Sequence, residues 1–63
     1  MPAETNQAKI LARLRREGFT LHRHGGDHDI YWHDDGRIVI VPRHRTLSRG
    51  VARSIAKAAG WQD

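Results

Sequence analysis

Glycine and proline residues divide this chain into five short segments, and they constrain the fold more than any other feature. Gly18 and Gly60 each follow a segment with helical periodicity, a position where glycine commonly ends a helix. The Gly25-Gly26 pair predicts a turn, and Asp35-Gly36 is a typical two-residue hairpin sequence. Pro42 ends an apolar run, because proline cannot donate a backbone hydrogen bond to a sheet. The segments therefore predict a helix, three strands and a second helix.

The apolar residues within the segments follow the periods of these elements. We predict helices at 5–17 and 46–59 and strands at 19–23, 28–33 and 37–41. Thr5 and Thr46 are the expected N-caps, because a threonine hydroxyl can accept from the free N–H groups of a first helical turn. The expected core of the two helices consists of Ile10, Leu11, Leu14, Leu47, Val51, Ile55 and Ala58.

The length and composition exclude several classes of protein. A chain of 63 residues can build only one hydrophobic core, so we expect a single domain over residues 1–63. It has no cysteine, which excludes disulfides and thiolate metal sites. The longest apolar run covers residues 38–41, whereas a membrane-spanning helix needs about 20. Residues 1–9 lack the apolar stretch of a secretory signal, and we therefore expect a cytoplasmic protein.

Positive charge is concentrated after the predicted hairpin. The net charge is +4, and no acidic residue occurs between Arg37 and Gln62. Most of the cations are arginines, whose planar guanidinium groups bind phosphate in bidentate fashion, so RNA or another polyanion is the expected partner. The expected phosphate-binding residues are Arg43, Arg45, Arg49, Arg53 and Lys57. A basic face that serves only solubility is the alternative.

The aromatic residues divide between core and surface. Phe19 follows the glycine that ends the first helix, and we expect it in the core. Tyr31 and Trp32 are neighbours in a strand, so their side chains point to opposite faces of the sheet. One of the two must therefore lie on the side without helices, where it is available to stack on a base or to anchor a protein partner.

Five histidines offer two kinds of chemistry, metal binding and proton transfer. They are His22, His24, His28, His33 and His44. Together with nearby aspartates they resemble a metal-ligand set, but strand alternation places His28 and His33 on opposite faces. We therefore expect no metal site, whereas proton transfer requires only one or two positioned imidazoles.

The order and spacing of several short motifs resemble the HicA family of toxins. The motifs are Gly26-Asp27-His28 with Tyr31, Val39-Ile40-Val41-Pro42-Arg43-His44, Leu47 with Gly50, Arg53-Ser54-Ile55, and Ala59-Gly60. The resemblance extends from about residue 6 to residue 61. It implies an α+β fold similar to double-stranded-RNA-binding domains, with a three-stranded antiparallel sheet and two helices on one face. It also implies a metal-independent endoribonuclease that cuts messenger RNA, needs no cofactor and is inhibited by a HicB-type antitoxin.

The resemblance also assigns roles to individual residues. The family's catalytic histidine follows a glycine and usually a serine or threonine; Gly26 and His28 match, and Asp27 occupies the middle position. His28 is thus the expected acid-base residue, Gly26 belongs to the expected RNA-binding set, and His24 and His44 are candidates for a second proton-transfer group. Two other classes remain open on the sequence alone, a non-catalytic RNA-binding module and a protein-interaction subunit.

Overall fold

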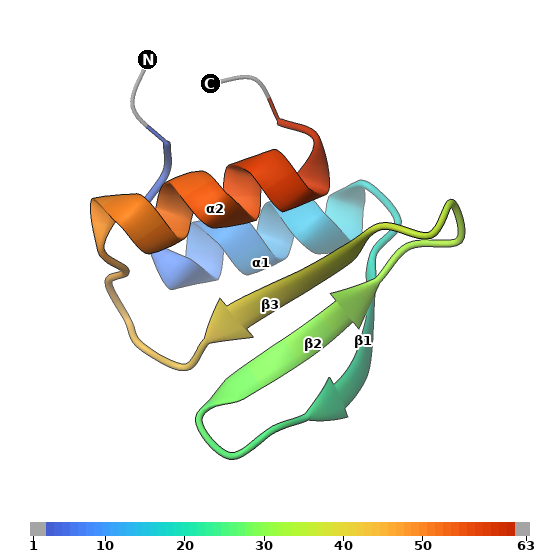
Figure 1. The fold of residues 1–63 in the computed structure, drawn as a ribbon, viewed down its shortest axis with the longest axis horizontal. Helices are drawn as coiled ribbons and strands as arrows, with labels where there is room; N and C mark the ends of the chain where they lie inside the picture. Colours follow the sequence, from blue (N-terminus) through green and yellow to red (C-terminus); the bar gives the residue numbers. More distant parts are fainter. Residues whose placement is uncertain (1–2, 62–63) are drawn as a thin grey trace.

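Two helices cover one face of a three-stranded sheet (Figure 1). The computed structural model describes residues 3–61; residues 1, 2, 62 and 63 lie outside this range. The elements follow the order α1 (Gln7–Arg16), β1 (Thr20–His24), β2 (His28–Trp32), β3 (Ile38–Pro42) and α2 (Arg49–Ala59). The predicted order of elements and the α+β fold similar to double-stranded-RNA-binding domains are confirmed.

The sheet is an antiparallel meander with β2 at its centre. β2 pairs with β3 without interruption, from His28 opposite Pro42 to Trp32 opposite Ile38. The pairing of β1 with β2 shifts between Leu21 and Arg23, where β1 contains one extra residue. Gly36 closes the hairpin between β2 and β3 with a φ of +97°, a backbone conformation that favours glycine.

The two helices run in the same direction because backbone and side-chain contacts join them at both ends. Before the helices, Asn6 and Thr46 form an isolated antiparallel bridge, and the Leu47 N–H donates to the Thr5 carbonyl at 2.8 Å. After the helices, the indole N–H of Trp61 donates to Glu17 Oε1 at 2.7 Å. The start of α2 therefore lies beside the start of α1, as Figure 1 shows.

This bridge explains why both predicted N-caps are wrong. Thr46 takes part in the bridge and Thr5 accepts from Leu47, so neither residue begins a helix. Asn6 caps α1 by accepting from the Lys9 N–H at 3.1 Å, and Ser48 caps α2 by accepting from the Val51 N–H at 3.2 Å. The helices begin one to three residues later than we expected.

The late start of α2 also changes which of its residues are buried. Leu47 is buried but precedes the helix, so its four-residue spacing to Val51 does not mark a helical face. Val51 and Ala58 are exposed, contrary to the prediction. Ile55 is buried as predicted, and the other buried residues of α2 are Ala52, Ala56 and Ala59. They join a core that includes the predicted Ile10, Leu14, Leu47 and Phe19, and Leu11 packs against it half-buried.

Strand alternation separates the two faces of the sheet as predicted. Tyr31, Val39 and Val41 are buried beneath the helices. Trp32 lies on the opposite, uncovered face with 44% of its surface exposed. Within residues 3–61, neither helix is long and apolar enough to cross a membrane.

Candidate functional site

His28 lies at one end of the sheet, where β2 begins and β3 ends. The turn before it is closed by a hydrogen bond of 2.7 Å from the Gly25 N–H to the His28 carbonyl. The imidazole packs closely over Gly25, because a Cβ placed there would lie only 2.7 Å from His28 Nε2. A Cβ at Gly26 would meet no described atom within 4 Å. The close approach in this turn therefore involves Gly25, which the sequence analysis did not single out.

Asp27 fixes the orientation of the His28 ring. Its Oδ1 lies 3.0 Å from His28 Nδ1, and this hydrogen bond is the main reason why the pKa of Asp27 is below its usual value. An ionised carboxylate can only accept a hydrogen bond, so Nδ1 carries the proton that is donated. Nε2 is then the nitrogen that is free to take up a proton. The Asp27 side chain is itself 90% exposed, and the pair is open to solvent.

A second group of side chains meets at Asp29, one residue further along β2. Asp29 Oδ1 lies 2.9 Å from Arg43 Nε and 2.7 Å from one terminal nitrogen of the same guanidinium. The same oxygen is 2.7 Å from His24 Nδ1. The bond with Arg43 is the largest cause that lowers the pKa of Asp29, and only 13% of the Asp29 side chain is exposed. Asp29 thus holds an arginine and an imidazole at the same end of the sheet as His28.

The loop after β3 is tied to the turn that carries His28. The Arg43 N–H donates to the Asp27 carbonyl at 2.9 Å. On the other side of the loop, the Gln7 side chain donates to the Pro42 carbonyl at 2.9 Å, and the Gln7 N–H donates to the Arg45 carbonyl at 3.1 Å. Arg43, His44 and Arg45 are all exposed within this anchored loop. The structure therefore brings Arg43 and its neighbours to the end of the sheet that holds His28.

The remaining predicted cations extend away from this end. Arg49 stands at the start of α2, and Arg53 and Lys57 follow at one-turn intervals of about 6 Å along the helix. The far end of α2 lies beside the start of β3, because Arg37 donates a hydrogen bond to the Ala59 carbonyl. Arg53 and Lys57 are exposed and lie toward the end of α2 that adjoins the start of β3, whereas His28 lies beside the end of β3.

The other histidines have separate surroundings. His33 Nε2 lies 3.1 Å from the Glu17 carbonyl, and its ring packs edge-on against Phe19, so it helps to fix the first helix against the sheet. His22 stacks on Trp32, with ring centroids 3.5 Å apart and planes at 10°. Among residues 3–61, no three or more His, Cys, Asp or Glu side chains form a group that could hold a metal ion.

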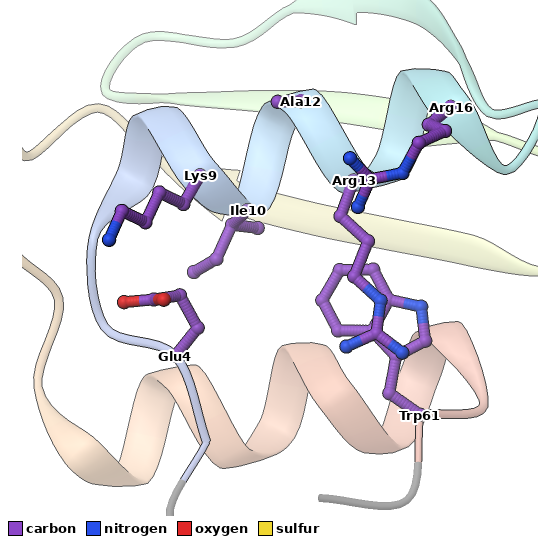
Figure 2. A pocket seen from close by; sticks show the side chains of 7 residues that line it. All are labelled: Glu4, Lys9, Ile10, Ala12, Arg13, Arg16 and Trp61. Carbon is purple, nitrogen blue, oxygen red and sulfur yellow. The ribbon is translucent and has the colours of Figure 1, made fainter.

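A pocket of about 340 Å³ extends along α1 on the side that faces α2 (Figure 2). Glu4, Lys9, Arg13 and Trp61 are among its lining residues. The guanidinium of Arg13 lies over the Trp61 ring at 4.2 Å from the ring centre. Arg13 and Trp61 also bind Glu17, and these bonds hold the pKa of Glu17 below its usual value. These contacts fix the end of the chain against α1, and no residue expected to contact RNA lines the pocket.

Sequence comparison supplies an independent finding. Residues 8–61 match the protein family described as HicA toxin of bacterial toxin-antitoxin. The match covers all five helices and strands and the end of the sheet that carries His28. A search of curated proteins found no match.

Proposed function

Because this chain belongs to the HicA family of toxins from bacterial toxin-antitoxin systems, we propose that it acts as an endoribonuclease on messenger RNA, with His28 as its acid-base residue. The observation that carries the proposal is the position of His28. Its ring is oriented by Asp27 and packed over Gly25, and the turn that carries it is bonded to the loop that begins with Arg43. Proton transfer, a fixed imidazole and a nearby cation are the elements that RNA cleavage requires.

The reaction needs little from the protein, because RNA carries its own nucleophile. His28 Nε2 takes the proton of a 2′-hydroxyl, and the 2′-oxygen forms a bond with the adjacent phosphorus. The bond from phosphorus to the 5′-oxygen breaks, and a protonated group returns a proton to that leaving oxygen. The products are a 2′,3′-cyclic phosphate and a free 5′-hydroxyl. No metal-bound water takes part in these steps.

Arg43 is our candidate for the cation that stabilises the charge developing on phosphorus, because its backbone N–H is bonded to the Asp27 carbonyl in the turn that carries His28. Its guanidinium is bonded to Asp29, which faces the opposite side of β2 from His28, so it would reach the phosphate around the end of the sheet. Two of its guanidinium nitrogens face Asp29, and 41% of its side chain remains exposed to a ligand. His24, held by the same carboxylate, and His44, in the loop after Arg43, are the candidates for the group that protonates the leaving oxygen. The remaining expected phosphate-binding residues, Arg45, Arg49, Arg53 and Lys57, extend from this loop along α2 and would contact RNA further from the cut.

A HicB-type antitoxin is the expected protein partner. A basic toxin offers steering charge to an acidic partner, and such charge raises association rates more than it raises affinity. An antitoxin that covers His28 and Arg43 together would block both proton transfer and phosphate binding. Co-expression with the product of each neighbouring gene tests this expectation, because one of them should co-purify with the toxin and suppress cleavage.

The chemistry of the cut ends tests the proposed reaction. Purified protein should cut single-stranded RNA in the presence of a chelator and leave 2′,3′-cyclic phosphate ends. Such ends block 3′-end ligation until acid opens the cyclic ester and a phosphatase removes the resulting monoester. Cleavage that stops on chelation and returns with zinc would replace this mechanism with a metal-dependent one. Binding of RNA without any cleavage would favour the alternative of a non-catalytic RNA-binding module.

A further inference from the structure

The uncovered face of the sheet carries an aromatic pair that the catalytic scheme does not use. Trp32 is 44% exposed, and the His22 ring lies parallel to it at a centroid distance of 3.5 Å. The extra residue in β1 between Leu21 and Arg23 allows His22 to face the same side as Trp32. A large exposed indole already stacked on a second flat ring is a surface to which another flat ring can be added.

A pocket next to Trp32 offers space for such a ring. It has a volume of about 200 Å³ and is lined by Trp32, His33, Gly36, Arg37 and Ile38. His22 belongs to β1 and does not line the pocket, whereas Ile38, which does, belongs to β3 on the other side of β2. The guanidinium of Arg37 is engaged elsewhere, by Asp35 at 2.8 Å, by the Ala59 carbonyl and over the Phe19 ring. The pocket is thus bounded mainly by an aromatic ring and an aliphatic side chain, which suits a flat base.

The charge on this face favours a nucleic acid as the occupant. Among the strand residues that face the uncovered side, none within the described range is acidic, and Arg23 adds positive charge on the same face as Trp32. The acidic residue of β2, Asp29, alternates to the opposite face. In the adjacent turn, Asp35 is paired with Arg37 and His33. Aromatic surface beside a cation binds successive bases of a single strand through stacking and backbone attraction.

The distance from Trp32 to His28 fits a strand of RNA that occupies both places. His28, Ile30 and Trp32 alternate onto the same face of β2, and Trp32 lies four residues beyond His28, which is about 13 Å. At the 3.4 Å spacing of stacked nucleotides this distance corresponds to about four nucleotides. A single strand whose phosphate lies at His28 can therefore place a nearby base at Trp32.

We propose that Trp32 and the adjacent pocket form a nucleobase-stacking subsite for single-stranded RNA, a few nucleotides from the phosphate that is cut. This inference rests on the proposed ribonuclease function and adds a contact that selects single-stranded over paired RNA. Bases in a duplex are stacked on one another and cannot enter the subsite.

The test uses His28→Ala protein, which keeps the RNA intact, and labelled single-stranded oligonucleotides that lack one base at a time. Removing the base that occupies the subsite should weaken binding, and the loss should fall at one position within about four nucleotides of the cut. Adding Trp32→Ala should weaken binding of the complete oligonucleotide by about 5- to 150-fold and abolish the effect of the missing base. The dependence of affinity on salt should stay the same, because stacking displaces no counterions.

Two further variants distinguish stacking on the Trp32 ring from the loss of any exposed apolar side chain. Trp32→Phe keeps an aromatic ring and should restore most of the affinity. Leu21→Ala removes an equally exposed apolar side chain, which faces the other side of the sheet with Tyr31 and lies outside the pocket, and it should leave binding unchanged. Circular dichroism shows whether each variant is folded, and the scan of missing bases on protein with an intact Trp32 gives an answer even if Trp32→Ala does not fold.

Three results would overturn the subsite. One is equal binding of all oligonucleotides that lack a base, and another is full affinity in the Trp32→Ala variant. The third is loss of antitoxin binding without loss of RNA binding, which would make this face a protein interface. Cleavage of the same oligonucleotide by the wild-type chain but not by His28→Ala reports separately on the ribonuclease, so failure of the subsite is distinguishable from failure of the proposed function.

Discussion

Replacing Gly25 with alanine tests whether the turn before β2 positions the His28 ring. The new methyl group would lie 2.7 Å from His28 Nε2, 2.9 Å from Cε1 and 3.0 Å from the His28 carbonyl oxygen. Ordinary contact begins at 3.4 Å, so Nε2 must move by about 0.7 Å or the backbone of the turn must open. A displacement of about 1 Å at a reacting group can cost about 10²-fold in rate. We therefore expect Gly25→Ala to lower the rate of RNA cleavage by roughly that factor.

Gly26→Ala is the matched control for this experiment. A Cβ at Gly26 meets no described atom within 4 Å, and its φ does not lie in the left-handed region. This variant should keep the wild-type rate and gain about 0.4 to 1 kcal/mol in free energy of unfolding, because alanine restricts the unfolded chain. Single-turnover cleavage rates and urea unfolding of both variants give the comparison. Equal rates for Gly25→Ala and the wild type, or equal damage by both substitutions, would refute the reasoning.

Three further predictions concern charge and packing. Asp29→Asn should lower the free energy of unfolding measured with urea at pH 7. The difference from the wild type should shrink as the pH falls below about 4, because the contacts that lower the pKa of Asp29 stabilise the fold only while its carboxylate is ionised. A difference that is constant with pH would contradict this. For binding of His28→Ala protein to single-stranded RNA, the logarithm of the binding constant should fall with the logarithm of the salt concentration at a slope of roughly −3 to −4. Adding Arg43→Ala should reduce the size of this slope by about 0.7. Affinity that does not depend on salt would exclude the basic surface as the RNA-binding surface. Leu14→Ala should lower the free energy of unfolding in urea by about 2 to 5 kcal/mol because Leu14 is fully buried, whereas Val51→Ala should change it by less than about 0.5 kcal/mol. Equal losses would mean that Val51 belongs to the core, as the sequence predicts.

The sequence predicts the order of elements well because glycine and proline end segments through local backbone chemistry. Gly18, Gly36 and Gly60 all adopt the positive φ that glycine favours. The N-caps of both helices depend instead on the bridge between Asn6 and Thr46, two residues that are distant in the sequence. The residue pattern within one segment cannot indicate this long-range contact. Because of the same bridge, α2 begins later in the sequence than predicted, and Val51 is exposed.

The candidate site is predicted in part for the same reason. The motif around His28 is local, and the sequence identifies it. The role of Asp29 depends on the register that places His24 opposite it and on the loop that returns Arg43 from the end of β3. The contact between His28 and Gly25 depends on how tightly the turn closes, and the adjacent glycines give no means of telling which of them is constrained. Geometry between strands, rather than residue type, determines these features.

The most direct test of the central claim is the rate of RNA cleavage by purified His28→Ala protein relative to the wild type. The fold of each protein is checked by circular dichroism, because an unfolded toxin is also inactive. His28 is half-buried at the end of the central strand and outside the core cluster, so the variant should remain folded. The account predicts that cleavage falls by about 10² or more while RNA is still bound. A folded His28→Ala protein that cuts RNA at the wild-type rate would contradict it.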